Sequence, residues 1–406
     1  MKGMKETKKI LLCLTIVLAS QLVKGQESYE TILRAVSLSE RGHADEAATI
    51  LEAMGETAIS ADMLPVRGDI FLGAGRQKEA RRDFMAAENL NQGSGMYGLA
   101  RCAAADGDAR AAVSYMEAHL RSKYRKNEPV ILLDDSFRSI ASSPEWKALW
   151  KKDWYKGYER KSWEIDYYIK SGRTDLAEEA WGELSALYPD MPVTEYCQSR
   201  IMMSRGRYRE ASEILARLTV SREAPAEWIY ALAEARAGEG SWYASATAYT
   251  RLIDAGHPDP QLILQRSRML IKAGDRESAK RDLERYMTID PEDTGALGLM
   301  GKTYAEEGAI YEALPYLNAN IEKHPGEPEA FSLRGDAWMA ARTWERAAED
   351  YTMSLDLDPE NAGVNLNMGI ALINSGRAAD ACHYLRKAKK LGEKNATQYL
   401  SRYCIK

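Results

Sequence analysis

Two segments that begin 34 residues apart follow one pattern: GDRESAKRDLERYMTIDP (Gly274–Pro291) and GAIYEALPYLNANIEKHP (Gly308–Pro325). Each begins with glycine, has alanine five residues later and leucine four residues after that, and ends with proline eight residues further on. Self-similarity at a fixed period is the sequence signature of repeat architectures. The first question is therefore how far along the chain this period extends.

The period extends over seven units, and five of its positions hold residues of one kind. The first position holds glycine in six units, with arginine in the remaining slot: Gly172, Gly206, Gly240, Gly274, Gly308, Arg342 and Gly376. A small residue follows: Ala177, Ala211, Ser245, Ala279, Ala313, Ala347 and Ala381. A large residue comes next: Trp181, Leu215, Tyr249, Leu283, Leu317, Tyr351 and Leu385. Four units close with proline: Pro189, Pro291, Pro325 and Pro359. Before the glycine lies a second small column: Ser199, Ala233, Ser267, Gly301, Gly335 and Gly369.

These residue types predict two helices of about a dozen residues in each unit. Glycine adopts the left-handed conformation that ends a helix, and proline cannot continue one. Small residues belong where two helices cross, and the large residue fills the space beside the crossing. Because one helix pair cannot bury its second face, each unit needs a neighbour. The predicted fold class is therefore all-α, an α-solenoid.

The rest of the chain divides around this array. Three looser repeats lie in residues 26–126, with their glycine, small and large positions at Gly42, Ala47 and Leu51; Gly75, Ala80 and Phe84; and Gly107, Ala112 and Met116. Residues 127–157 break the pattern and form an aromatic-rich helical insert, in which Trp146, Leu149, Trp150 and Trp154 have helical spacing. The insert is either a core wedge between two arrays, which we favour, or an aromatic docking patch. The regular array is expected to cover residues 158–395, and residues 396–406 to form a capping helix.

The segment LGLMGKTYAEEGAIYEALPYLNANIEKHP (Leu297–Pro325) resembles the tetratricopeptide repeat (TPR) family through Leu297, Met300, Gly301, Tyr304, Ala313, Leu317 and Pro325. The resemblance implies antiparallel helix pairs in a right-handed superhelix and a role in holding proteins or peptides. Members that bind chaperone tails use a Lys, Asn, Asn, Lys, Arg clamp. Here the corresponding positions hold other residue types, such as Ser162, Asp166 and Cys197, so a chaperone tail is not expected as the ligand.

The N-terminus has the pattern of a secretory signal peptide: four early lysines, then the apolar run ILLCLTIVLA (Ile10–Ala19). Cleavage is expected between Gly25 and Gln26. The alternative is an N-terminal anchor helix, but the run is short of the roughly 20 apolar residues that span a bilayer. After cleavage no stable transmembrane segment is expected. The chain is thus predicted to be an exported bacterial protein that is periplasmic, secreted or associated with the envelope.

Charge and cysteine content narrow the function. Residues 1–25 hold five lysines and one glutamate, so cleavage changes the net charge from −5 to −9. A nucleic-acid partner, which requires a basic face, is not expected. Cys102, Cys197, Cys382 and Cys404 show no metal-binding spacing and are interpreted as small buried residues. Only Cys382 and Cys404 are near enough in the array to pair.

No catalytic constellation is found. The histidines His43, His119, His257, His324 and His383 are scattered without ligand spacing, and no phosphate-binding glycine loop or nucleophile elbow occurs. No metal, cofactor or enzymatic activity is predicted.

First-helix side chains line the concave groove in TPR proteins. The 34-residue phase assigns to this groove Tyr196, Arg200, Met203, Tyr230, Glu234, Arg268, Ile271, Lys272, Lys302 and Met339. Aromatic and arginine residues are favoured anchors at interfaces, although a solvated helix face is an equal alternative. The positive members Arg200, Arg268, Lys272 and Lys302 favour an acidic partner segment. The predicted function is a non-enzymatic scaffold of the cell envelope that binds partner proteins or peptides. The alternative is a structural subunit of an envelope or secretion assembly that uses its whole surface.

Overall fold

The computed structural model describes residues 26–54 and 59–404, and all regular secondary structure in these ranges is helical. The predicted all-α class is confirmed. The predicted signal peptide falls on residues 1–25, outside the described part of the chain. Two compact units follow one another, with the division after Met269.

The first unit begins with a helical segment at residues 26–40. The helices that follow are α2 (Ala44–Met54), α3 (Leu64–Gly73), α4 (Gln77–Leu90), α5 (Met96–Ala105), α6 (Ala109–Arg121), α7 (Glu128–Leu132), the 3₁₀ turn η1 (Asp135–Phe137), α8 (Pro144–Leu149), α9 (Gly157–Lys170), α10 (Thr174–Leu187), α11 (Pro192–Ser204), α12 (Tyr208–Leu218), α13 (Ala226–Gly238) and α14 (Trp242–Asp254). Helix α15 (Gln261–Ala273) crosses the division.

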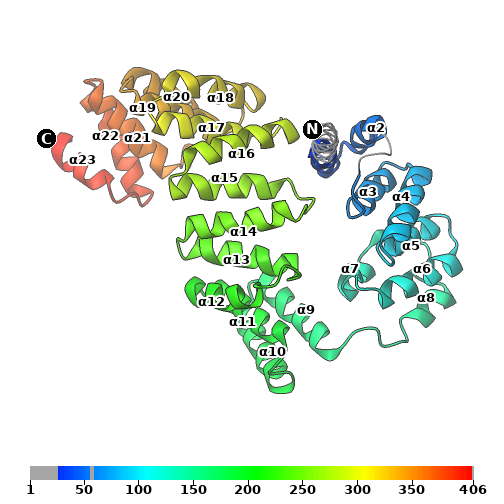
Figure 1. Ribbon diagram of the computed structural model, residues 1–406. Helices are drawn as coiled ribbons and strands as arrows, with labels where there is room; N and C mark the ends of the chain where they lie inside the picture. The colour runs from blue at the N-terminus through cyan, green and yellow to red at the C-terminus, as the bar shows by residue number, and fades with distance from the viewer. Residues whose placement is uncertain (1–25, 55–58, 405–406) are drawn as a thin grey trace, which may run out of the picture. The chain divides into compact units, whose positions relative to one another are not determined.

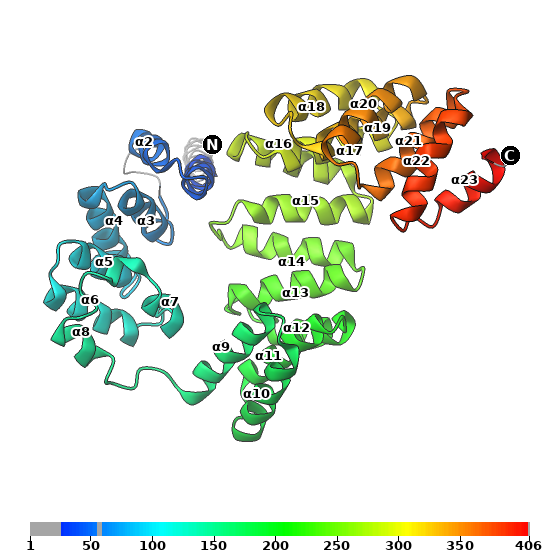
Figure 2. The ribbon, with the colours of Figure 1, turned by 180° about the vertical axis from the view of Figure 1, so that it is seen from behind.

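The second unit continues with α16 (Arg276–Ile289), α17 (Thr294–Glu306), α18 (Ile310–Lys323), α19 (Pro328–Ala340), α20 (Trp344–Leu357), α21 (Ala362–Asn374), α22 (Ala378–Lys390) and α23 (Ala396–Tyr403). In both units consecutive helices pack as pairs, for example α13 with α14 and α21 with α22 (Figure 1). The pairing of α13 with α14 is equally clear from behind (Figure 2). First helices of successive pairs also touch, as α11 does with α9 and α13.

The predicted small and large columns meet at the helix crossings. A Cβ added at Gly301 would lie 2.5 Å from Leu317 Cγ, and one at Gly335 would lie 2.7 Å from Tyr351 Cε1. Ala313, in the other small column, is fully buried. Non-bonded carbon atoms prefer separations of about 3.5–4.0 Å, so no larger residue fits at these positions without moving a helix. The predicted role of the columns in helix packing is confirmed.

The glycine column has the predicted left-handed backbone, and Arg342 shares it. Gly308 has φ 79° and Gly376 has φ 81°. Arg342, in the one slot without glycine, has φ 58° and is the only non-glycine residue of the described ranges with positive φ. The repeat geometry therefore imposes on an arginine a conformation that costs an L-residue roughly 1–2 kcal/mol.

Replacement of this arginine should therefore stabilise the second unit. Arg342→Gly removes the left-handed strain but gives the unfolded chain extra freedom, which offsets about 0.4–1 kcal/mol. We expect a net gain of about 0.5–1 kcal/mol, measured as slower hydrogen exchange in α19 and α20. Gly308→Arg, the reverse change one repeat earlier, should destabilise α17 and α18. Equal exchange in Arg342→Gly and the parent chain would contradict this account.

Two arginine–aspartate ion pairs, which share the same sequence separation, each connect the two helices of one repeat. The guanidinium of Arg67 donates two hydrogen bonds of 2.6 Å to the carboxylate of Asp83. Arg334 donates to Asp350 in the same bidentate way, at 2.9 and 2.7 Å. In each pair the acid follows the arginine by 16 residues. The Arg67–Asp83 pair lies in the core, with side-chain exposures of 4% and 2%, whereas Arg334 is 25% exposed.

The insert between α6 and α9 packs into the core of the first unit. Phe137, Trp146, Leu149 and Tyr155 are buried in one cluster with residues of α5 and α6. These side chains form a wedge and not a docking patch. Ser143 caps α8 by accepting a hydrogen bond of 3.1 Å from the Trp146 amide.

The expected helical spacing through Trp154 is wrong, because α8 ends at Leu149. The indole N–H of Trp154 instead donates to the carbonyl oxygen of Leu149, at 2.9 Å, and this oxygen also accepts from the Lys152 amide at 3.3 Å.

A disulfide joins Cys382 of α22 to Cys404, directly after α23. The two cysteines are 22 positions apart in the sequence, so the bond closes a short loop. The other two described cysteines, Cys102 and Cys197, are free and buried, as expected for small apolar residues. The disulfide therefore attaches the terminal helix to the last helix pair.

Loss of this bond should release α23 selectively. A disulfide that closes a loop of this length is typically worth about 2–4 kcal/mol. We expect Cys404→Ser to accelerate hydrogen exchange in α23 by at least about tenfold. Cys197→Ser, which removes a free thiol elsewhere, is the matched control and should leave α23 unchanged. Unchanged exchange of α23 after Cys404→Ser would contradict a restraining role for the bond.

Candidate functional site

Three first helices of the first unit, α9, α11 and α13, line a pocket of about 500 Å³. Three repeat positions, each occurring once in every helix, provide most of its wall: Glu159, Val193 and Glu227; Ser162, Tyr196 and Tyr230; Asp166, Arg200 and Glu234. Within a helix these positions differ by three, four or seven residues, which places them on one face. The pocket is therefore a direct product of the 34-residue period.

Aromatic side chains form one side of this pocket. The rings of Tyr196 and Trp228 are stacked, with centroids 5.3 Å apart and planes 19° from parallel. Tyr230 contacts Tyr249 edge to face, at 5.8 Å. Burial raises the pKa of the Tyr196 hydroxyl well above its ordinary value, so this residue stays neutral. The pocket thus presents half-buried, uncharged rings to a ligand.

The charged side chains of the pocket are largely paired. Arg200 contacts Glu234 at 3.2 Å and Asp166 at 3.9 Å, and Lys170 contacts Asp166 at 2.6 Å. Glu227 has no ion pair among the described residues. Although much of this residue is exposed, partial removal of its carboxyl from water, with the nearby charge of Asp166, raises its pKa. The nearby charges of Arg200 and Lys170 offset this rise only in part, so the pocket contains one carboxylate without a direct ion pair.

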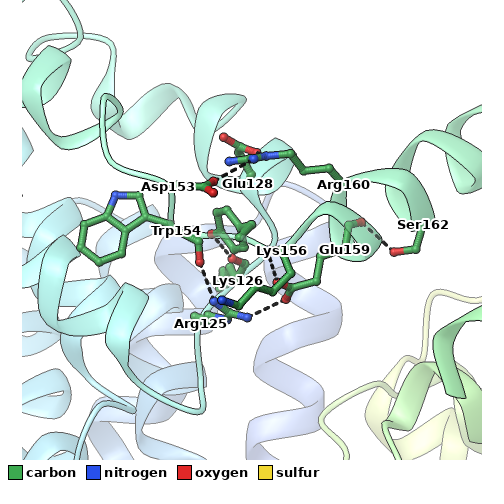
Figure 3. A network of polar contacts seen from close by, with 10 residues as sticks. Arg125, Lys126, Glu128, Asp153, Trp154, Lys156, Glu159, Arg160 and Ser162 are labelled. Carbon is green, nitrogen blue, oxygen red and sulfur yellow. Dashed lines mark hydrogen bonds and ion pairs between the residues drawn. The ribbon is translucent and has the colours of Figure 1, made fainter. Parts of the chain in front are cut away.

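A polar network fixes α9 to the loop that precedes the insert (Figure 3). Arg125 donates to the carbonyl oxygen of Trp154 at 2.8 Å and to the carboxylate of Glu159 at 2.6 Å. Glu159 also accepts from the Lys156 amide at 2.7 Å, which is the acidic half of a capping box at the start of α9. The network therefore places Asn127, two residues after Arg125, at the rim of the pocket.

The same junction is held by a second set of contacts (Figure 3). Arg160 of α9 contacts Glu128 at 2.8 Å and Asp153 at 2.9 Å. Tyr155 donates to the carbonyl oxygen of Lys126 at 2.6 Å. Because contacts from both sides of the insert converge on α9, the first repeat of the regular array has a fixed starting position.

The ten residues predicted for the groove are distributed over both units. Four of them line the pocket: Tyr196, Arg200, Tyr230 and Glu234. Met203 and Arg268 belong to the first unit but not to the pocket lining, and Ile271, Lys272, Lys302 and Met339 belong to the second unit. Arg268, Lys272 and Lys302 are exposed, while Met339 packs against the core of its unit. The pocket therefore includes four of the ten, and a binding role for the other six stays a prediction.

Sequence reasoning missed several pocket residues. Val193 and Glu227 precede Tyr196 and Tyr230 by about one helical turn, and Glu159 is the equivalent residue of the preceding repeat. The 34-residue period could therefore have identified all three. Trp228 and Trp163 do not follow from the phases chosen. Asn127 comes from the irregular insert, for which the period gives no information.

Other kinds of site are not evident in the described part of the chain. Residues 26–54 and 59–404 contain no group of three or more His, Cys, Asp or Glu side chains arranged to hold a metal ion. In the same ranges no helix combines the length and apolarity that crossing a membrane requires.

Repeated helix pairs with small residues at the crossings and a pocket on the first helices define an α-solenoid of helical repeats. The family profile described as tetratricopeptide repeat matches residues 299–362. This part of the chain is thus similar to the tetratricopeptide repeat family, and the helix pairs around it repeat the same unit.

Relatives and solved structures agree with this assignment. The TPR repeat-containing protein YpiA of Bacillus subtilis is 21% identical over 197 residues, which cover 48% of this chain and 46% of YpiA. Tetratricopeptide repeat protein 16 of Mus musculus is 25% identical over 121 residues, which cover 27% of this chain and 16% of that protein. The match thus spans less than half of either curated relative. A crystal structure of a tetratricopeptide repeat protein from Parabacteroides merdae has a TM-score of 0.51 at 15% identity and covers 61% of this chain and 99% of its own.

Proposed function

We propose that the chain is a non-enzymatic scaffold that holds a partner protein or peptide against the first helices of its regular array. The observation that carries this proposal is the pocket lined by α9, α11 and α13. Concave sites with convergent aromatic and charged side chains are the usual places of binding. Tyr, Trp and Arg, which dominate binding energy at interfaces, are all present.

Site-specific photo-crosslinking in the native host tests this proposal. A benzophenone amino acid replaces Tyr230 in the pocket or, in the matched control, Tyr243, which is 67% exposed on the second helix α14. We expect a discrete crosslinked partner from position 230 and none from position 243. Crosslinks from position 243, with none from 230, would favour the alternative, a structural subunit that uses its outer surface.

We further propose that the protein is exported to the cell envelope. The basic and apolar pattern of residues 1–25 supports export, and so does the Cys382–Cys404 disulfide, because such bonds persist in oxidising compartments. The intact mass of the protein purified from its native host decides the matter. A mature chain that begins at Gln26 is expected. A mass that retains Met1 would exclude cleavage, and recovery of that uncleaved chain in the cytosolic fraction would overturn export.

A further inference from the structure

We infer that the pocket on α9, α11 and α13 receives a basic side chain, arginine or lysine, of an extended partner segment. This inference rests on the proposed scaffold function and specifies the chemistry of the partner. The sequence alone favours an acidic partner, whereas this inference gives the partner a positive charge. The reason is that Arg200, one of the residues expected to attract an acidic segment, already contacts Glu234 and Asp166. Three observations lead to a cation.

The first observation is the charge balance of the lining. It contains four acidic side chains, Glu159, Asp166, Glu227 and Glu234, and two basic ones, Lys170 and Arg200. Lys170 forms an ion pair with Asp166, and Arg200 forms one with Glu234. Glu159 forms an ion pair with Arg125, which is not part of the pocket lining. One carboxylate, that of Glu227, therefore has no direct ion pair among the described residues, although the nearby charges of Arg200 and Lys170 act on it. A positively charged ligand group would form the ion pair that Glu227 lacks.

The second observation is the position of this carboxylate beside an aromatic platform. Trp228 directly follows Glu227 in the chain, and its ring stacks on Tyr196 at 5.3 Å. The face of tryptophan is the best aromatic surface for a cation, and a guanidinium can stack on it while its N–H groups reach a carboxylate. An aromatic ring and a carboxylate without an ion pair, the two groups that bind an arginine, thus occur together in this lining, where Glu227 also accepts a hydrogen bond from the Trp228 side chain.

The third observation is the available space and the hydrogen-bonding groups at the rim. A pocket of about 500 Å³ exceeds the volume of one side chain and can include flanking backbone. Asn127 at the rim makes no side-chain hydrogen bond as the N-cap of α7, so its amide can pair with a peptide backbone. The raised pKa of Glu227 is consistent with this account, because an incoming cation would offset both its causes, partial burial and the charge of Asp166.

The test measures the affinity of the full chain for three capped, fluorescent peptides of nine residues at constant ionic strength. Their alanine, serine and glycine background carries two central arginines, two citrullines or two glutamates. Citrulline keeps the shape of arginine without its charge. We expect the arginine peptide to bind at least about tenfold more tightly than the citrulline peptide, and the glutamate peptide to bind most weakly.

Two variants assign the preference to the pocket. Glu227→Gln and Trp228→Leu should each reduce the preference for arginine over citrulline by about tenfold. Glu223→Gln, which neutralises an exposed carboxylate outside the pocket, should leave it unchanged. Thermal unfolding confirms that each variant is folded. The inference is overturned if wild type shows no preference, if the preference survives in both pocket variants, or if the arginine peptide does not bind below about 1 mM.

The two proposals can fail separately. If crosslinking at position 230 captures a partner and Glu227→Gln leaves that crosslink unchanged, the scaffold function stands and the basic side chain is excluded. If position 230 captures nothing while position 243 does, the groove itself is not the binding surface. If the glutamate peptide binds most tightly, the result would instead support the acidic partner segment that the sequence alone favours.

Discussion

Asp83→Ala is expected to be among the most destabilising single substitutions in the first unit, by about 3–5 kcal/mol. The carboxylate of Asp83 joins α4 to α3 through two hydrogen bonds of 2.6 Å from Arg67, and both side chains are almost fully buried. Its removal leaves a guanidinium charge in the core without its carboxylate. Hydrogen exchange in α3 and α4 measures the effect, because unfolding of a repeat array need not be two-state.

Two comparisons separate the buried charge from lost packing. The double variant Arg67→Met, Asp83→Leu removes both charges and should recover most of the stability, since well-packed apolar residues often replace buried pairs at little cost. Asp350→Ala breaks the equivalent pair of the second unit, where Arg334 is 25% exposed and also donates to Asn318 at 2.8 Å. Its effect should be clearly smaller. Equal effects at the two sites would show that burial of the charge is not the cause.

The fold could be predicted from the sequence because its repeated unit is local. A glycine that ends one helix and a proline that follows the next are signals within a few residues, and the period of 34 repeats them. Even the exception was visible: Arg342 stands in the glycine slot and adopts the glycine conformation, with φ 58°. Local signals of this kind survive because neighbouring units impose the same geometry on each.

The binding pocket could be predicted only in part, since it depends on contacts that the period does not encode. Tyr196 and Tyr230 follow from the repeat phase. The engagement of Arg200 by Glu234 and Asp166 does not, because side-chain pairing across helices depends on rotamers and distances. The sequence therefore located part of the lining but favoured a partner of opposite charge to the one that we infer from the ion pairs.

Substitution of a glycine at a helix crossing is the second change that we expect to be strongly destabilising. Gly301→Leu is expected to destabilise the second unit by about 3 kcal/mol, because overpacked cores lose about 1–3 kcal/mol and sometimes more. A Cβ at this position would lie 2.5 Å from Leu317 Cγ and 3.3 Å from the carbonyl oxygen of Ala313. The side chain of Leu317 is fully buried, so it cannot move into solvent. The helices α17 and α18 must therefore separate.

The damage should spread along the array, since each repeat is stabilised by its neighbours. We expect faster hydrogen exchange in residues 294–359 and much less change before residue 120. Gly182→Leu is the matched control, because Gly182 lies inside α10 with no atom within 4 Å of an added Cβ. Leucine is the better helix former by about 0.5–1 kcal/mol, so this control should be neutral or stabilising. Uniform loosening of the whole chain by Gly301→Leu, or loosening by both substitutions alike, would contradict close packing at the crossing as the cause.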